Sequence, residues 1–193
     1  SALLLILAFY SSYRSGRIIG PPASGHARML AELEGVKVRS ESSDFFGDAK
    51  LKEALAILPQ LPITKDSAML MTVNQLIGEE SLKLGDPETA LKYLKEAYDA
   101  MVFQDLPSDI QTDQLFILAV ASLRLGEVEN CINCQTSDSC IFPIQRDGIH
   151  TFRRGSEQAV AYLEELLKRQ PDNIKAKWVL NIAQMTLGGY PQS

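Results

Sequence analysis

The segment from Gly85 to Ala90 constrains the fold most, because the residue pattern around it returns twice further along the chain. It joins two stretches whose apolar residues recur with helical period. The glycines that end the recurring pattern, at 85, 126 and 188, are 41 and 62 residues apart. Such recurrence predicts a helical repeat protein. The aligned pairs are Ile77-Gly78 with Leu84-Gly85, Leu118-Ala119 with Leu125-Gly126, and Leu180-Asn181 with Leu187-Gly188.

Three consecutive residues of this segment predict a short turn between two helices. Gly85 can take the left-handed conformation that ends a helix, Asp86 can cap the next helix, and Pro87 fits its first turn. Leu84 and Leu125 are expected in the last turn of their helices, on the buried side. The second helices should pack through an apolar face made of Ala90, Leu94 and Ala97, which returns as Ala159, Leu163 and Leu166 before Pro171.

A capping box predicts where the first helix of the second repeat begins. Ser108 and Gln111 have its Ser-x-x-Gln form, so a new helix should start near Asp109. The buried stripe expected on this helix consists of Leu115, Leu118, Ala119 and Ser122.

These positions agree in phase over three units, and the chain from Asp66 to Tyr190 resembles the tetratricopeptide repeat family. The period of that family is about 34 residues, so spacings of 41 and 62 leave insertions of 7 (41 − 34) and 28 (62 − 34) residues. The resemblance implies an all-α fold: a tetratricopeptide-type helical solenoid of antiparallel helix pairs with a long cysteine-containing insertion. The repeats are expected over 66–193 and the insertion over 127–155.

The same resemblance implies which side chains would face a bound protein. In that family the first helix of each pair lines a concave groove. The alternative is a groove filled by the chain's own N-terminal stretch or by its loop. The groove residues implied here are Thr72, Gln75, Glu79 and Lys83 from one repeat, and Asp113, Phe116, Val120 and Arg124 from the next.

Composition places the chain among ordinary globular proteins and disfavours nucleic acid as a partner. Apolar residues make up 46% of its 193 residues and charged residues 22%, and the net charge is −5. Phosphate binding needs a basic stripe, and the pair Arg153-Arg154 does not supply one. Few aromatic residues and abundant Ala, Leu, Glu and Lys favour helices over sheets.

Residues 1–19 are predicted to be a hydrophobic segment that contacts a membrane or directs export. A serine without a preceding Met is followed by nine apolar residues, so the natural N-terminus is expected further upstream. Nine residues cannot span a bilayer, which needs about 20, but they can be half of a membrane helix or the core of an export signal. The alternative is a helix buried in this protein or against a partner. Arg14 and Arg17 suit a lipid headgroup layer.

Residues 20–65 are predicted to be a linker followed by two capping helices. A short helix is expected over 26–34, with Met29, Leu30 and Leu33 on one face. A polar connection from Arg39 to Asp44 should lead to a second helix over 48–58, which Pro59 and Pro62 end. This pair resembles the degenerate terminal unit that covers the first repeat of an array.

All three cysteines fall within ten residues of the insertion, at 131, 134 and 140. A disulfide between Cys131 and Cys140 would require an oxidising compartment. The alternatives are reduced cysteines, or a metal site of the three cysteines with His150, whose spacing is only partly ligand-like. Covalent haem is unsupported, because Gln135 and not a histidine follows Cys134. The apolar residues Ile141, Phe142 and Ile144 are expected to be buried by the loop.

A closer resemblance covers the chain from Leu123 to Pro191. It is similar to the tetratricopeptide region that precedes FG-GAP and ASPIC/UnbV domains in exported bacterial proteins. This resemblance implies export, and singles out Cys131 and Cys140 as the recurring pair. The resemblance covers the repeat region and not the propeller, so the propeller's calcium and carbohydrate roles are not carried over. The matching strings are Ser139 to Ile144, Gly148-Ile149-His150, Gly155-Ser156, Trp178 to Ala183 and Thr186-Leu187-Gly188.

The sequence offers no catalytic constellation, so we predict that the chain is not an enzyme, uses no cofactor and takes no small-molecule substrate. It has no glycine-rich phosphate loop, no nucleophile elbow and only two histidines. The leading hypothesis is an extracytoplasmic or periplasmic, membrane-associated scaffold that binds proteins. The alternatives are an accessory subunit buried in a larger assembly and a cysteine-based metal or redox module. The acidic pairs Glu79-Glu80, Glu127/Glu129 and Glu164-Glu165 are interpreted as solvated faces.

Overall fold

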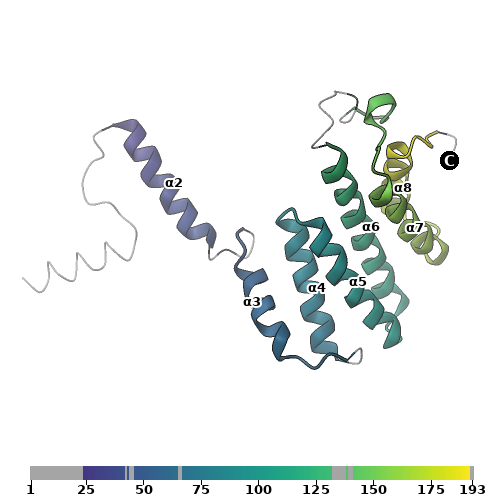
Figure 1. The fold of residues 1–193 in the computed structure, drawn as a ribbon, viewed down its shortest axis with the longest axis horizontal. Helices are drawn as coiled ribbons and strands as arrows, with labels where there is room; N and C mark the ends of the chain where they lie inside the picture. Colours follow the sequence, from purple (N-terminus) through teal and green to yellow (C-terminus); the bar gives the residue numbers. More distant parts are fainter. Residues whose placement is uncertain are drawn as a thin grey trace, which may run out of the picture. The chain divides into compact units, whose positions relative to one another are not determined.

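The computed structural model of the chain describes residues 24–41, 43, 46–64, 67–131, 138 and 141–191 (Figure 1). These residues form α-helices and short 3₁₀ helices, and no strand occurs among them, so the all-α prediction is confirmed. The chain divides into two compact units, Ser1–Ala49 and Lys50–Ser193. The predicted membrane or export segment, 1–19, lies outside the described residues. In the part of the chain that is described, no helix is long and apolar enough to cross a membrane.

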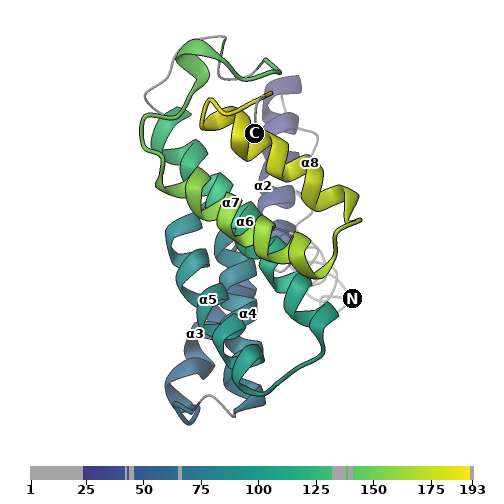
Figure 2. The same ribbon diagram turned by 90° about the vertical axis from the view of Figure 1, so that its right-hand side faces the viewer.

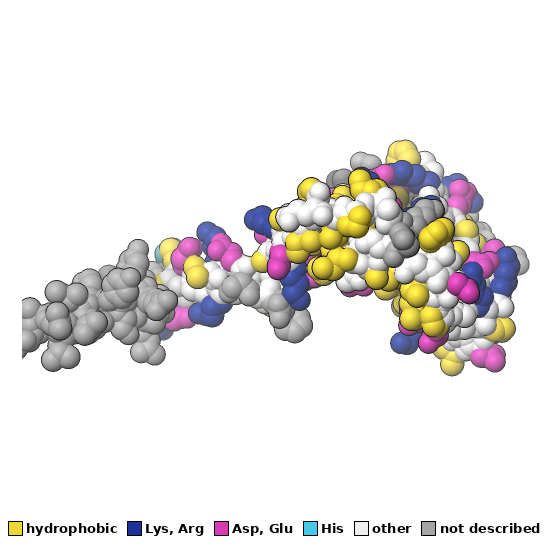
Figure 3. All heavy atoms as spheres, turned by 90° about the horizontal axis from the view of Figure 1, so that it is seen from below, with side chains coloured by type: hydrophobic (Ala, Val, Ile, Leu, Met, Phe, Trp, Pro, Cys, Tyr) yellow, Lys and Arg dark blue, Asp and Glu magenta, His cyan; other side chains and the backbone are white. Residues whose placement is uncertain are grey.

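The described part of the first unit is dominated by one helix, α2 (Gly25–Glu41). The predicted short helix, 26–34, is therefore too short at its end, and Arg39 belongs to the helix and not to a connection. Gly35 costs a helix only about 1 kcal/mol, which does not end it. No residue of α2 is buried, and its predicted apolar face is exposed. Figure 3 shows hydrophobic and charged side chains intermixed on this helix.

The second unit begins with α3 (Ala49–Ile57) and the 3₁₀ helix η1 (Leu58–Gln60). The predicted helix over 48–58 is thus confirmed to within one residue at each end. Ala54 of α3 forms a small core cluster with Val73 and Ile77. Pro59 lies in the first turn of η1, where a missing N–H costs no hydrogen bond.

The pair α4 (Ala68–Lys83) and α5 (Pro87–Phe103) follows the predicted turn chemistry. Gly85 has a φ of +85°, the left-handed conformation, and Asp86 Oδ1 accepts a hydrogen bond from Thr89 N at 3.0 Å. The helices approach closely at Gly78, where an added Cβ would lie 2.5 Å from Leu94 Cγ. The expectation for Leu84 is wrong: it is 43% exposed, because it follows the last helical residue instead of facing α5.

The second pair consists of α6 (Ser108–Cys131) and α7 (Arg154–Arg169), and α8 (Ile174–Thr186) follows. α6 begins one residue before the predicted start, but the capping box is not formed. Gln111 Nε2 instead donates to the carbonyl oxygen of Leu106 at 2.7 Å, and Gln111 N donates to that of Pro107. The helix also runs through Gly126 to Cys131, so the interval 127–155 starts with helix and not with a turn.

From α4 onward each helix packs mainly against the next one in the sequence (Figures 1 and 2). The main core lies between α6, α7 and α8. The predicted stripe of α6 and the predicted apolar face of α7 are both buried, as is Leu125. Residues of this core are Leu115, Ala119 and Leu123 from α6, Ala159, Leu163 and Leu166 from α7, and Ala176, Val179 and Ala183 from α8.

Candidate protein-binding surface

Most polar groups of the four groove residues predicted on α4 are engaged within the helix. Thr72 Oγ1 donates to the Ala68 carbonyl oxygen at 2.9 Å. Gln75 Nε2 donates to Glu79 Oε1 at 2.5 Å. Lys83 Nζ pairs with Glu80 Oε2 at 2.9 Å. Thr72, Glu79 and Lys83 are exposed and Gln75 is half-buried. Gln75 Oε1 is buried and has no hydrogen-bond partner among the described residues.

The four predicted residues on α6 differ in character. Asp113 and Arg124 are exposed, whereas Phe116 and Val120 are half-buried. Arg124 pairs with Glu127 one turn later. Phe116 packs against the core between α6, α7 and α8, so its ring is fixed by that packing. The predicted groove residues on α6 thus include an aromatic ring fixed by core packing, Phe116, and an exposed carboxylate, Asp113.

Asp113 and Phe116 line a hollow of about 420 Å³ that α8 completes. None of the residues predicted on α4 lines it. The structure therefore brings Asp113 and Phe116 of α6 together with the first residues of α8. The other lining residues are Thr112, Asp172, Asn173, Ile174 and Lys175.

The helix α8 carries a third set of equivalent positions that the sequence analysis missed. Adding the spacing of 62 residues to Asp113, Phe116 and Val120 gives Lys175, Trp178 and Ile182. These three positions share one face of α8, because they lie three and four residues apart. The same spacing that aligned the glycines would have found them.

A second hollow, of about 250 Å³, lies further along this face of α8. Trp178 is 64% exposed at its edge, and Phe142 and Tyr190 add two more aromatic rings. None of its described lining residues is charged. Asn181, Ile182 and Met185 complete it.

The loop that supplies Phe142 is attached to α7 and α8 by a buried polar cluster. His150 N donates to the Thr186 carbonyl oxygen at 2.8 Å. The imidazole Nδ1 lies 2.9 Å from Ser156 Oγ, which is 2.8 Å from Thr186 Oγ1. Ile144 is buried as predicted, whereas Ile141 and Phe142 are 61% and 60% exposed, contrary to expectation. A loop held by polar contacts does not need to bury every apolar side chain.

The same loop is tied to the end of α6 by Asn130. Its side-chain amide donates to the Phe152 carbonyl oxygen at 2.9 Å and accepts from Phe152 N at 2.9 Å. Nearby, Arg154 pairs with Glu129 at 2.6 Å and with Glu88 of α5 at 2.8 Å. These contacts hold the residues just before α7 against both earlier helices.

Burial lowers the pKa of His150, while the negative charges of Glu127 and Glu129 oppose that shift. The imidazole is therefore held neutral, with Nδ1 engaged by Ser156. The side chain of Cys131 and all of Cys134 and Cys140 lie outside the described residues. The disulfide, the reduced cysteines and the metal site accordingly all stay predictions.

The interpretation of the acidic pairs as solvated faces is correct for only some of their members. Glu79 and Glu164 are exposed. Glu80 is 8% exposed and pairs with Lys83, and Glu129 is half-buried beside Arg154. The local sequence does not show which member of an adjacent pair faces the neighbouring helix.

No protein-family model, no curated protein and no solved structure matches the chain.

Proposed function

We propose that this chain is a non-catalytic scaffold that binds a protein segment along α6 and α8. In this proposal α4 to α8 form a tetratricopeptide-type solenoid of helix pairs, with the cysteine-containing insertion between α6 and α7. The observation that supports it most is the placement of two hollows on one face of α8. One contains Phe116 and Lys175, and the other contains Trp178 and Ile182.

The spacing of the hollows suits a short segment of a partner protein. From Lys175 to Met185 the helix rises about 15 Å, at about 1.5 Å per residue. Two side chains of one bound segment, about four or five residues apart in extended chain, would span that distance. Exposed Trp and Tyr are the residue types that most often dominate binding energy at protein interfaces.

The charges at the two hollows differ: Asp113 and Asp172 lie beside Lys175 in the first hollow, and no charged residue among those described lines the second. From Ile174 to Ser193 the sequence contains two lysines and no acidic residue, although the whole chain has a net charge of −5. Electrostatic complementarity adds to association rate and specificity. The proposed partner segment therefore combines a polar or charged side chain for the first hollow with an apolar side chain for the second.

Photo-crosslinking tests this proposal in the organism that makes the protein. A benzophenone amino acid at Asn181, which lines the second hollow, should join the partner segment. The same amino acid at the exposed position Glu164 on α7 is the control. A synthetic peptide of the joined segment should then shift the fluorescence of Trp178, which is the single tryptophan of the chain.

Substitutions then test whether the Trp178 side chain contributes much of the binding energy. Trp178→Ala should weaken calorimetric binding of that peptide by at least about tenfold, a loss typical of a central aromatic residue. Phe103→Ala removes a similarly exposed ring from α5 and should leave affinity unchanged. Equal effects of the two substitutions, or equal crosslinking from Asn181 and Glu164, would show that the binding surface lies elsewhere.

The proposal also places the protein outside the cytoplasm, associated with a membrane through residues 1–19 and with Cys131 bonded to Cys140. What supports this placement is the sequence of segments that lie outside the described residues. Peptide mapping without reductant, on protein isolated from its native compartment, should recover the Cys131 and Cys140 peptides joined. Recovery of both as free thiols would reject the bond.

A further inference from the structure

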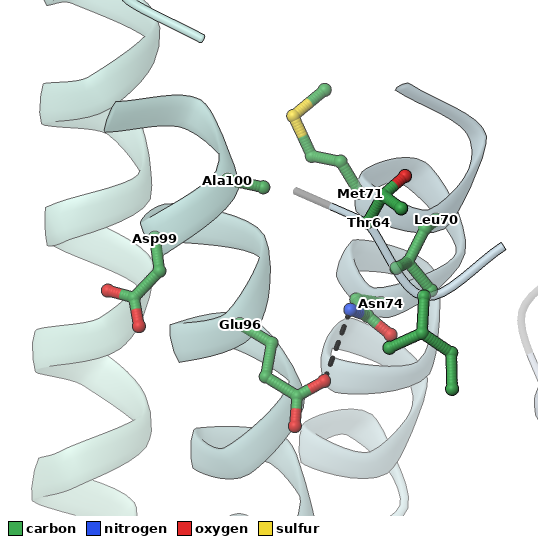
Figure 4. Close-up of a pocket in the computed structure, with 8 residues that line it drawn as sticks. Thr64, Leu70, Met71, Asn74, Glu96, Asp99 and Ala100 are labelled. Carbon is green, nitrogen blue, oxygen red and sulfur yellow. Dashed lines mark hydrogen bonds between the residues drawn. The ribbon is translucent and has the colours of Figure 1, made fainter. Parts of the chain in front are cut away.

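A separate hollow of about 170 Å³ lies between α4 and α5 (Figure 4). Its walls are mainly apolar and come from Leu70 and Met71 of α4, Ala100 of α5 and Ile63 before α4. A cavity of about 150 Å³ can hold a ligand the size of benzene, so this one has room for a single side chain. None of the residues predicted for the groove lines it.

One polar side chain in this hollow is buried and incompletely bonded. Asn74 is 3% exposed and interrupts the apolar side of α4 that faces α5. Its Nδ2 donates to Glu96 Oε2 at 3.2 Å, and Figure 4 shows the amide oxygen turned away from that carboxylate. Asn74 Oδ1 has no hydrogen-bond partner among the described residues. Buried polar atoms are rarely left so, and a donor entering the hollow would give this oxygen a partner.

The charge at this hollow is negative. Glu96 and Asp99 line it, and no lysine, arginine or histidine of the described part of the chain does. Asp99 is already paired with Lys95 Nζ at 3.0 Å. Glu96 accepts the bond from Asn74, and no ion pair of Glu96 occurs in the part of the chain that the structure describes. The hollow therefore combines apolar walls with one carboxylate that has no cation from those residues.

We propose that this hollow binds an arginine side chain of a protein partner. The aliphatic stem of arginine packs against apolar walls while its guanidinium stays at the polar edge. The guanidinium carries five N–H donors in a fixed planar fork, so it can serve the Glu96 carboxylate and the Asn74 amide oxygen together. A lysine ammonium concentrates its three donors at one point. An uncharged apolar side chain would leave the Asn74 amide oxygen without a donor and the Glu96 carboxylate without a cation.

Methyl NMR tests the proposal with a small probe. Met71 lines the hollow, whereas Met29 lies on α2 and serves as an internal reference. N-acetyl-arginine amide should shift the Met71 methyl signal with an affinity on the order of 1 mM, as expected for a ligand of its size. N-acetyl-norleucine amide has an uncharged side chain and should bind at least about tenfold more weakly. Equal shifts from the two probes would overturn the assignment to a cation.

Charge-removing variants supply the second half of the test. Glu96→Gln keeps the side-chain shape, and its affinity for the arginine probe should fall about tenfold, the loss of one charge-assisted bond. Glu164→Gln removes an exposed carboxylate from α7 and should leave the affinity unchanged. Equal losses in both variants would mean that the probe responds only to net charge, and the proposal would fail.

Two further comparisons decide what occupies the hollow. N-acetyl-lysine amide should bind more weakly than the arginine probe, and tighter binding would overturn the choice of arginine. Lys65 comes directly after Thr64 of the hollow in sequence and lies outside the described residues, so Lys65→Ala tests whether the chain supplies its own cation. The affinity of this variant should match that of the parent chain, and a gain above tenfold would show an internal occupant.

Discussion

The first helices of the pairs α4–α5 and α6–α7 were both expected to end at an aligned glycine, Gly85 and Gly126, yet the two glycines serve different purposes. Gly85 ends α4 in the left-handed conformation, and nothing lies within 4 Å of where its Cβ would be. Gly126 instead lies inside α6, where an added Cβ would be 3.1 Å from His150 Nδ1. The first glycine is needed for backbone conformation and the second for space.

The residues directly after each glycine explain the difference. Asp86 and Pro87 stop one helix and start the next, whereas Glu127 and Val128 after Gly126 are compatible with continued helix. Glycine alone therefore did not end α6. An aligned glycine predicts a turn only together with the capping residues after it.

The largest expected effect comes from filling space between α6 and α7. A Cβ at Gly155 would lie 2.5 Å from both Gly126 N and the Ser122 carbonyl oxygen, which are backbone atoms and cannot rotate away. Gly155→Ala should lower the free energy of unfolding by about 3 kcal/mol, measured by urea denaturation. Gly85→Ala, which meets only the left-handed penalty, should cost about 1 kcal/mol. A larger loss of unfolding free energy for Gly85→Ala than for Gly155→Ala would contradict the distinction between a glycine needed for backbone conformation and a glycine needed for space.

A smaller effect is expected from detaching the loop at Asn130. Asn130→Ala removes the donor and the acceptor that hold the two backbone polar groups of Phe152. The free energy of unfolding should fall by about 2 kcal/mol, because these groups lose their partners. Hydrogen exchange of the Phe152 backbone amide should accelerate by a larger factor than exchange of the Thr89 amide, which lies in the first turn of α5. Unchanged exchange at Phe152 would show that other contacts hold the loop.

The cap of α5 should contribute less than the loop contacts. Asp86→Ala removes the acceptor for Thr89 N and should cost about 1 kcal/mol of unfolding free energy. Asp86→Asn keeps an acceptor but loses the charge, so at pH 7 it should cost less than Asp86→Ala and still leave the wild type more stable. Hydrogen bonds from Thr89 lower the pKa of Asp86 below its usual 3.8, so the wild-type advantage over Asp86→Asn should shrink as pH falls below that value. If the stability advantage of the wild type over Asp86→Asn instead grew as pH fell, the Asp86 carboxylate would not be the cap of α5.

The smallest expected effect is a pH dependence of the loop region. Burial lowers the pKa of His150 below its usual 6.5, so the native state favours the neutral ring. Stability from this site is complete above pH 6.5 and is lost as pH falls through the lower native pKa, because unfolding then releases the ring to take up a proton. The difference in unfolding free energy between wild type and His150→Gln should therefore narrow below pH 6.5. A difference that widens there would mean that the native state favours the charged ring.

Local residue pattern predicted most helices of the second unit closely. α3 starts and ends within one residue of expectation, and α4 ends and α5 begins at the predicted turn, because prolines, caps and a left-handed glycine mark these ends. α2 and α6 ran longer than expected, since an internal glycine weakens a helix without ending it. Of the candidate surface, Asp113 and Phe116 were predicted from the resemblance to a repeat family, whereas Lys175 and Trp178 were not.

The all-α class, the turn at Gly85 and the apolar faces could be read from the residues alone, because each depends on positions within one or two helical turns of one another. Which polar groups form hydrogen bonds with each other was determined only by the packing of the helices. Asn130 and Phe152 are 22 residues apart and Ser156 and Thr186 are 30 apart, yet both pairs are hydrogen-bonded. Asn74 reaches Glu96 in the same way, 22 residues on. Residue pairs this far apart leave no periodic pattern in the sequence. They are determined by how the helices pack and by which buried groups need a hydrogen bond.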